Sequence, residues 1–165
     1  MDNPRISIPG GNGRMGRTLI TEVLNSKNTV LSNCTCLPGE PELGMDLGIL
    51  AGQDKINRFL TDDKQSITEN TDVIIDFTVP KASLYHTKIA AERGVPIVIG
   101  TTGLVEKELE ELKLYSKKIP IVYSANFSIG IAVMQDLIQD SVKKLGLDWD
   151  IEILETHHNK KVDAP

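Results

Sequence analysis

Apolar and polar positions follow one another along the chain in a pattern that predicts strands and helices in turn. Short apolar or alternating runs, which are typical of strands, occupy 5–9, 29–36, 73–77, 97–99, 121–123 and 150–154. Segments with apolar residues three or four positions apart, the spacing of one helix face, occupy 15–24, 80–93, 106–115 and 129–145. The stretch 38–60 is rich in Gly and Pro and predicts mostly loop, with a short helix near Leu47. Strands that alternate with helices predict an α/β fold, here a Rossmann-like, doubly wound parallel sheet.

Composition and charge restrict the classes of function. The 165 residues are 40% hydrophobic and 25% charged, which is ordinary for a globular domain. The net charge of −5 argues against a nucleic-acid partner, although backbone N–H groups can still hold a small phosphate-bearing cofactor. The chain has no apolar run of the roughly 18 residues that a membrane helix needs, and its start lacks the pattern of a secretory signal. With only two cysteines, Cys34 and Cys36, these features predict a cytoplasmic protein without a membrane contact.

A glycine-rich loop at 10–16, with the sequence GGNGRMG, follows the first predicted strand and opens the first predicted helix. This is the setting of a dinucleotide-binding turn. Gly10 permits the tight turn, Gly13 lets a pyrophosphate approach the backbone, and Gly16 lets the helix lie close to the strand. The helix N-terminus offers N–H groups and a partial positive charge to the phosphates. The spacing is GxxGxxG, with Asn12 at a usual glycine position, and a short loop with a purely structural role is the alternative.

The second predicted strand ends in Cys-Thr-Cys-Leu at 34–37, where a dinucleotide fold usually carries an acid for the adenosine ribose. No acid or arginine stands there, and Glu40 and Glu42 come only later. The choice between NADH and NADPH is therefore not readable from this segment.

Small polar residues follow three other predicted strands, at 76–78, 100–103 and 124–127. In open α/β sheets ligands lie outside the carboxyl ends of the strands, so these segments are candidates to contact a ribose or a nicotinamide. Loops need such residues for their turns as well, and the binding interpretation depends on the nearby glycine loop.

Two adjacent histidines, His157 and His158, and a nearby lysine, Lys161, lie in the segment 155–165. Histidine titrates near neutral pH and can supply a proton during reduction of a polarised double bond, while lysine offers a positive charge to a carboxylate or an oxyanion. A metal site is disfavoured because a third ligand at suitable spacing is missing, and a solvated loop is the other alternative. The remaining histidine, His86, is predicted to be a surface or edge residue.

Taken together, these motifs resemble the dihydrodipicolinate reductase family, the 4-hydroxy-tetrahydrodipicolinate reductases of lysine and diaminopimelate biosynthesis. The matching segments are GGNGRMGR at 10–17, IDFTVP at 75–80, VIGTTG at 98–103, SANFSIG at 124–130 and ETHHNKKVDAP at 155–165. The last of them is the most specific, and the glycine loop alone would not identify the family.

The resemblance implies hydride transfer from NADH or NADPH to a cyclic dicarboxylate substrate, giving tetrahydrodipicolinate after loss of water, without a metal. It implies that His157 is the proton donor and acceptor, that Lys161 is a second proton donor, and that His158 contacts a substrate carboxylate. The cofactor contacts that it implies are Gly10, Gly11, Asn12, Gly13, Arg14, Met15, Phe77, Gly100, Thr101, Thr102, Ser124, Ala125, Asn126 and Phe127. Members of the family form homotetramers at full length.

Three departures from the family pattern stand out. Cys36 occupies a usually acidic position, and Val79 occupies a position that is often basic, with Lys81 two places on. Family members are also considerably longer and continue Ser-Gly-Thr after the Asp-Ala-Pro. We therefore expect a C-terminally truncated chain with a dinucleotide-binding domain at 1–128 and the start of an α+β substrate and tetramerisation domain at 129–165. By itself it is expected to bind cofactor weakly and to turn over little substrate.

Two alternatives to a reductase of this family stay open. The first is a non-catalytic dinucleotide-binding module, which would need the glycine loop but not the two histidines and the lysine. The second is a related NAD(P)-dependent oxidoreductase that acts on an aldehyde or a sugar.

Overall fold

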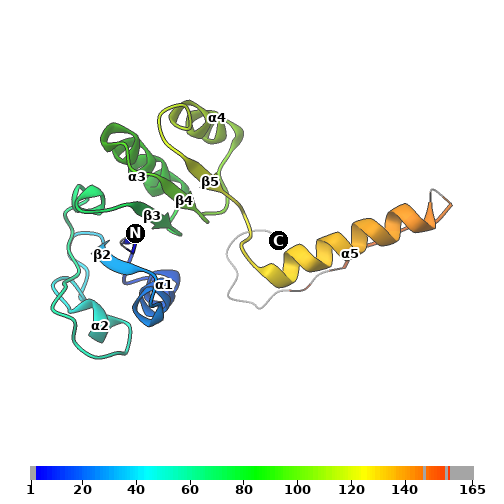
Figure 1. The fold of residues 1–165 in the computed structure, drawn as a ribbon. Helices are drawn as coiled ribbons and strands as arrows, with labels where there is room; N and C mark the ends of the chain where they lie inside the picture. The colour runs from blue at the N-terminus through cyan, green and yellow to red at the C-terminus, as the bar shows by residue number, and fades with distance from the viewer. Residues whose placement is uncertain (1–2, 147, 155, 157–165) are drawn as a thin grey trace. The chain divides into compact units, whose positions relative to one another are not determined.

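The structure is a computed structural model that describes residues 3–146, 148–154 and 156. Its residues form two compact units, which meet in the chain between Ser124 and Ala125. The first unit contains the sheet and the second contains one long helix (Figure 1).

Five parallel strands form the sheet of the first unit. They are β1 (Arg5–Pro9), β2 (Val30–Thr35), β3 (Val73–Asp76), β4 (Ile97–Ile99) and β5 (Ile121–Tyr123), in the order β2-β1-β3-β4-β5. The chain moves from β1 to one side and then returns to build the other side, so the strand order reverses between β1 and β3. Such a switch point opens a crevice at the carboxyl ends of the strands. The predicted Rossmann-like parallel sheet is therefore confirmed.

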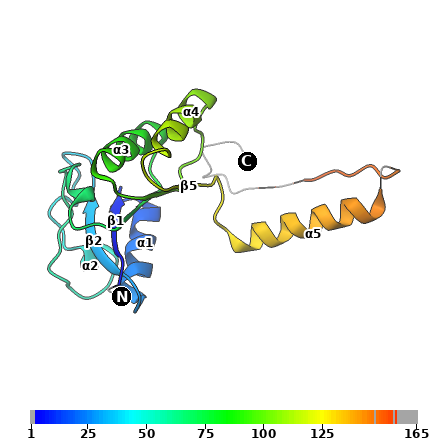
Figure 2. The same ribbon diagram turned by 45° about the horizontal axis from the view of Figure 1, so that its top comes forward.

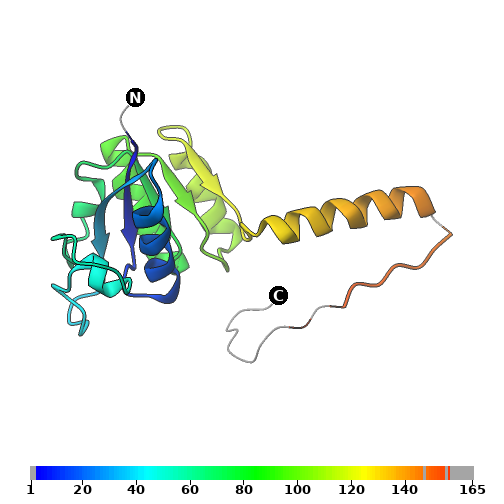
Figure 3. The same cartoon turned by 60° about the horizontal axis from the view of Figure 1, so that its bottom comes forward.

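Helices cover both faces of this sheet, as right-handed crossovers require. They are α1 (Arg14–Asn25), α2 (Leu47–Leu50), α3 (Pro80–Arg93) and α4 (Glu106–Tyr115), with a short 3₁₀ helix, η1 (Ser66–Thr68), that the pattern did not predict. Figure 2 shows α1 running alongside β1, and Figure 3 shows α1 in front of the sheet with the green helices behind it. The predicted helices are confirmed to within a residue or two.

Two apolar clusters form the core, one on each side of the switch point. Ile8 and Ile20 belong to the cluster that packs α1 and α2 against β1 and β2. Ile74 and Ile97 belong to the cluster that packs α3 and α4 against β3 and β4.

Local chemistry sets the helix ends that matter for the site. Helix α3 begins with Pro80, whose missing N–H costs nothing in a first turn, and ends at Gly94, which has a φ of 72°. Helix α2 is capped by Asp46, whose carboxylate accepts hydrogen bonds from Gly48 N and Ile49 N.

The second unit contains α5 (Ile129–Leu145), which Ser128 caps by accepting a hydrogen bond from Ile131 N and which ends at Gly146. The structure describes this helix in full, and none of its residues is buried. The predicted strand at 150–154 is wrong, because these residues form no ladder with any other described segment. A strand needs a neighbour for its backbone hydrogen bonds, and here the side chain of Leu154 is 93% exposed.

Among the helices of the described residues, none is long and apolar enough to cross a membrane.

Candidate functional site: a cavity at the glycine loop

The glycine loop turns the chain tightly from β1 into α1. Gly10 has a φ of 68°, in the left-handed region that favours glycine. Gly13 N donates to Gly10 O over 3.0 Å, and Gly11 N donates to Thr35 O of β2 over 2.9 Å. A Cβ at Gly10 would lie 2.8 Å from the methyl carbon of Thr78, so the loop also passes close to the end of β3.

Helix α1 starts directly against this loop. A Cβ at Gly16 would overlap the carbonyl oxygen of Gly10 and would lie 2.7 Å from the Cα of Gly11. No described side chain caps the helix at Gly13, and no acid stands in its first turn. The N–H groups of that turn therefore remain available for an anion.

A cavity of about 720 Å³ opens beside the loop, at the switch point between β1 and β3. Its size is within the usual range for ligand sites, roughly 300–1,000 Å³. The lining comes from the glycine loop, the end of β2, the β3–α3 junction and two further loops: Gly10, Asn12, Gly13, Arg14, Met15, Gly16, Thr35, Cys36, Leu37, Glu40, Lys64, Phe77, Thr78, Val79, Lys81, Ala82, Tyr85 and His86. This lining contains three cationic side chains and one carboxylate, although the whole chain is acidic, with a net charge of −5.

A buried hydrogen-bond network supports the β3 side of the cavity. Nδ1 of His86 lies 2.7 Å from Oδ2 of Asp76, which is fully buried. The other carboxylate oxygen of Asp76 accepts from Thr78 N over 2.8 Å and from Thr78 Oγ1 over 2.6 Å. This one carboxylate therefore fixes both the turn after β3 and the imidazole on α3.

The prediction that His86 is a surface or edge histidine is wrong, since the residue is only 7% exposed. It shares an inward face of α3 with Ser83, Thr87 and Ala90, all of which are buried. The spacing 83, 86, 87 and 90 is the periodicity of one helix face. That spacing is the signal that could have shown His86 to face inward.

Hydroxyl groups extend this network from β3 to the end of β4. Thr78 Oγ1 and Ser83 Oγ are 3.3 Å apart, and Ser83 Oγ shares a 2.6 Å hydrogen bond with Thr101 Oγ1. Gly100 N donates to Asp76 O over 2.8 Å, and a Cβ at Gly100 would overlap the ring of Phe77. The predicted contacts at 100–101 are thus held in place by the β3–α3 junction.

The structure brings together some of the predicted cofactor contacts and not others. Those that line the cavity are Gly10, Asn12, Gly13, Arg14, Met15 and Phe77. Gly11 does not line the cavity, and a Cβ there would lie 2.9 Å from that of Cys34. Thr101 is buried, and Thr102, which also follows β4, is exposed. Ser124 follows β5 and donates from its N to Ile99 O over 3.2 Å.

Other predicted residues lie beyond the first unit. Ala125, Asn126 and Phe127 belong to the second unit and are exposed. The three residues predicted for proton transfer and substrate binding, His157, His158 and Lys161, lie outside the described residues.

The end of β2 presents a thiol where the fold usually carries a carboxylate. Burial raises the pKa of Cys36, and the neighbouring Asp62, Glu40 and Glu42 raise it further. Burial also raises the pKa of Cys34, which is fully buried. Both thiols therefore stay protonated and act as small apolar side chains.

Besides His86, sequence reasoning missed two residues of the cavity, Lys64 and Tyr85. Nζ of Lys64 lies 5.5 Å from the centroid of the Tyr85 ring, over its face. The two residues come from segments 21 positions apart, and the local pattern around Lys64 carries no signal for the contact. Of the two residues, only Tyr85 could be placed from the sequence, on the apolar stripe of the predicted helix.

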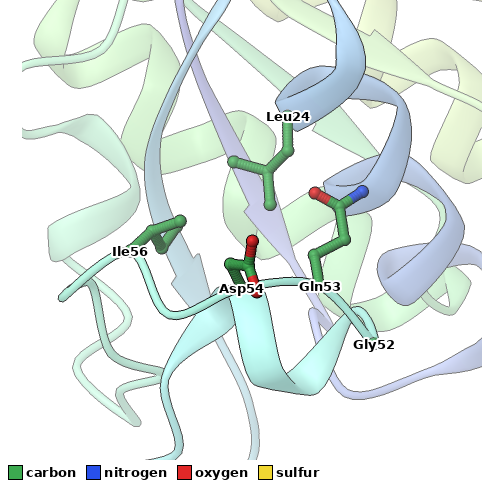
Figure 4. Close-up of a pocket in the computed structure, with 5 residues that line it drawn as sticks. All are labelled: Leu24, Gly52, Gln53, Asp54 and Ile56. Carbon is green, nitrogen blue, oxygen red and sulfur yellow. The ribbon is translucent and has the colours of Figure 1, made fainter.

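A second hollow, of about 510 Å³, lies between the end of α1 and the loop after α2 (Figure 4). Leu24, Gly52, Gln53, Asp54 and Ile56 line it, and it shares no residue with the cavity at the glycine loop. Its lining offers one carboxylate, that of Asp54. Among the residues that the structure describes, no three or more His, Cys, Asp or Glu side chains are grouped to hold a metal ion.

Comparison with known proteins gives relatives along almost the whole chain. The 4-hydroxy-tetrahydrodipicolinate reductase of Chromohalobacter salexigens is 43% identical over 162 residues, which are 98% of this chain and 60% of that protein. The reductase of the same name from Acinetobacter baumannii is 43% identical over 162 residues, which are 98% of this chain and 59% of that protein. The chain thus spans about 60% of the length of the curated relatives it matches.

Solved structures show the same fold. A dihydrodipicolinate reductase from Paenisporosarcina sp. TG-14, solved with bound dipicolinate, matches with a TM-score of 0.68 at 24% identity, covering 84% of this chain and 53% of that one. The scyllo-inositol dehydrogenase of Lactobacillus casei, solved with bound NAD(H) and scyllo-inositol, matches with a TM-score of 0.64 at 15% identity, covering 85% of this chain and 42% of that one. At these identities the likeness shows the fold alone.

Family models cover both units. The model for the N-terminus of dihydrodipicolinate reductase matches residues 4–127, and the model for its C-terminus matches residues 130–165. The chain therefore belongs to the dihydrodipicolinate reductase family.

Proposed function

We propose that the chain is the cofactor-binding part of a 4-hydroxy-tetrahydrodipicolinate reductase, which reduces its substrate to tetrahydrodipicolinate with NADH or NADPH. The observation that carries the proposal is the cavity at the switch point, where a tight glycine loop meets a helix N-terminus without a side-chain cap. The relatives that carry this enzyme's name match 98% of the chain. The Rossmann-like fold also supports a nicotinamide cofactor.

The residues present fit such a cofactor. The first-turn N–H groups of α1 and the backbone at Gly13 would hold the pyrophosphate, because no Cβ or capping side chain obstructs them. Arg14 lines the same end of the cavity and adds positive charge. Cys36 and Leu37, at the end of β2, would face the adenosine. When bound, the reduced nicotinamide supplies a hydride.

The nicotinamide end of the site would involve the ends of β4 and β5. Gly100 and Thr101 are oriented by the hydrogen bonds that reach them from β3 and α3. The remaining proposed contacts at this end are Thr102, Ser124, Ala125, Asn126 and Phe127. A rigid strand end is a suitable base for them, since small shifts of a bound ring are costly for hydride transfer.

The proton chemistry belongs to the segment after α5. We propose that His157 supplies the proton, that Lys161 is the second proton donor, and that His158 pairs with a substrate carboxylate. Histidine and lysine suit these tasks because one titrates near neutral pH and the other carries a positive charge. In this proposal residues 129–165 begin the substrate domain of a cytoplasmic enzyme whose longer form assembles as a homotetramer.

Two measurements test the proposal. Fluorescence titration of the chain with reduced cofactor should give saturable binding. In a chain extended to the full length of its relatives, His157→Gln and Lys161→Ala should each lower kcat by about a hundredfold or more while leaving the Kd for the cofactor unchanged. Pyridine-2,6-dicarboxylate, which resembles the product in shape, should compete with substrate.

Each outcome has a clear meaning. A chain that binds neither reduced cofactor overturns the proposal. Unchanged kcat in both variants would instead favour a related oxidoreductase whose proton transfer uses other residues, and cofactor binding without any turnover would favour a non-catalytic dinucleotide-binding module.

A further inference from the structure

Two lysines from outside the glycine loop contribute to the lining of the cavity. They are Lys64 and Lys81, and Tyr85 lines the cavity with them. Lys81 and Tyr85 are four residues apart on α3, so they are neighbours on one helix face. Side chains of an α-helix lean toward its N-terminus, so the ring of Tyr85 is expected over the helical turn that contains Lys81.

The same ring also orients Lys64. Nζ of Lys64 lies over the face of Tyr85 at 5.5 Å from its centroid, and Gln65 Nε2 donates to the Tyr85 hydroxyl over 3.4 Å. A cation over an aromatic face is attracted to it. The ammonium group of Lys64 thus contacts Tyr85, and Lys81 lies one helical turn before the same residue on α3.

The start of α3 adds to this positive region. Val79 is its N-cap residue, no described side chain caps the helix, and its first turn contains no acid. Lys81 stands in that first turn, where the helix dipole already favours an anion. The glycine loop and the N-terminus of α1 can bind both phosphates of the pyrophosphate. Lys64 and Lys81 would therefore have no phosphate to pair with unless the cofactor carries a further one.

Acidic groups near this region are few or already engaged. Glu40 is the one carboxylate of the lining, and its Oε2 accepts from Asn12 Nδ2 over 3.1 Å. Glu42 pairs with Arg17 over 2.9 Å, and Asp62 is exposed outside the lining. The end of β2 itself presents Cys36, an uncharged thiol in place of an acid that would repel a phosphate.

We propose that Lys64 and Lys81, which line the cavity together with Tyr85, bind the 2′-phosphate of NADPH and give this chain a preference for NADPH over NADH. The proposal rests on the proposed function, since it concerns the adenosine end of the same cofactor site. The 2′-phosphate carries the charge that distinguishes the two cofactors, and two charge-assisted contacts account for a preference of about tenfold or more.

The test is a binding titration of the chain with NADPH and NADH, followed by fluorescence and repeated by calorimetry with 2′,5′-ADP and 5′-AMP. We expect tighter binding of NADPH and of 2′,5′-ADP, by about tenfold or more, with a preference that shrinks as salt is raised. In K64Q/K81Q the two cofactors should bind within about threefold of each other, with the Kd for NADH unchanged.

Lys88→Gln is the matched control, because Lys88 is an exposed lysine of α3 outside the lining; it should retain the preference. Circular dichroism establishes that each variant is folded. Equal affinity of the parent chain for NADPH and NADH, or a full preference in K64Q/K81Q, overturns this inference and leaves the proposed function intact. Binding of neither cofactor overturns the proposed function as well.

Discussion

Asp76 and His86 form a buried pair, with Oδ2 of the carboxylate 2.7 Å from Nδ1 of the imidazole. The carboxylate ends β3, the imidazole lies on the second turn of α3, and His86 also lines the cavity. The pair therefore ties the strand to the helix at the wall of the cavity. Its integrity decides the position of Thr78, which the same carboxylate holds.

Breaking this pair should be costly. His86→Leu leaves Oδ2 of a fully buried carboxylate without its hydrogen-bond partner, and we expect the free energy of unfolding to fall by about 3–5 kcal/mol in a urea titration. The double variant Asp76→Asn/His86→Leu should lose less than the single variants Asp76→Asn and His86→Leu combined. Strictly additive losses would contradict the coupling of the two side chains.

Gly16→Ala should damage cofactor binding through the backbone alone. The new Cβ would overlap the carbonyl oxygen of Gly10, so the loop must move away from the start of α1. We expect the Kd for reduced cofactor to rise by about tenfold or more, which corresponds to about 1.4 kcal/mol. Gly130→Ala is the matched control, since its Cβ would meet only Ser128 Oγ, at 3.7 Å. An unchanged Kd in G16A would show that the loop does not contact the cofactor.

The core beneath β4 should respond to truncation as a close-packed interior. Ile97 is 1% exposed and belongs to the cluster with Ile74. Ile97→Ala should lower the free energy of unfolding by about 2–5 kcal/mol, measured by urea titration with circular dichroism. Leu114→Ala, at a side chain that is 61% exposed, should change it by no more than about 0.5 kcal/mol. Equal losses in the two variants would be inconsistent with this packing.

Asp46 should make stability depend on pH. Burial acts to raise the pKa of its carboxyl, but hydrogen bonds from the backbone N–H groups of Ile56, Asn57, Ile49 and Gly48 outweigh it, and the pKa lies below its ordinary value. A depressed pKa means that the stabilisation is present above the unfolded pKa, about 3.9, and is lost as the pH falls through the folded pKa.

Asp46→Asn should accordingly lower the Tm most at neutral pH, with a difference from the parent chain that shrinks below about pH 4. Thermal unfolding followed by circular dichroism between pH 7 and pH 2 measures the Tm of the variant and that of the parent chain. Asp136→Asn, at an exposed position of α5, is the control and should leave the Tm close to that of the parent. A difference that stays constant down to pH 2 would exclude the ionised carboxylate as its cause.

Much of the first unit could be predicted because its signals are local. The apolar run at 73–77 and the spacing of Gly10, Gly13 and Gly16 each depend on neighbours within a few residues, and β3 and α1 follow them closely. The strand predicted at 150–154 failed because a strand is a pairing between segments, and the described residues supply it with no partner. The roles of His157, His158 and Lys161 remain predictions.

Periodicity, glycine spacing and strand-end polarity in the sequence were enough to establish the Rossmann-like sheet and the place of the glycine loop, because the backbone responds to them over a few residues. Tertiary structure alone decided that Asp76 meets His86 and that Lys64 lies over Tyr85. The strand β3, the helix α3 and the loop before η1 converge at one edge of the sheet only after the crossovers have folded, and no local pattern encodes that convergence.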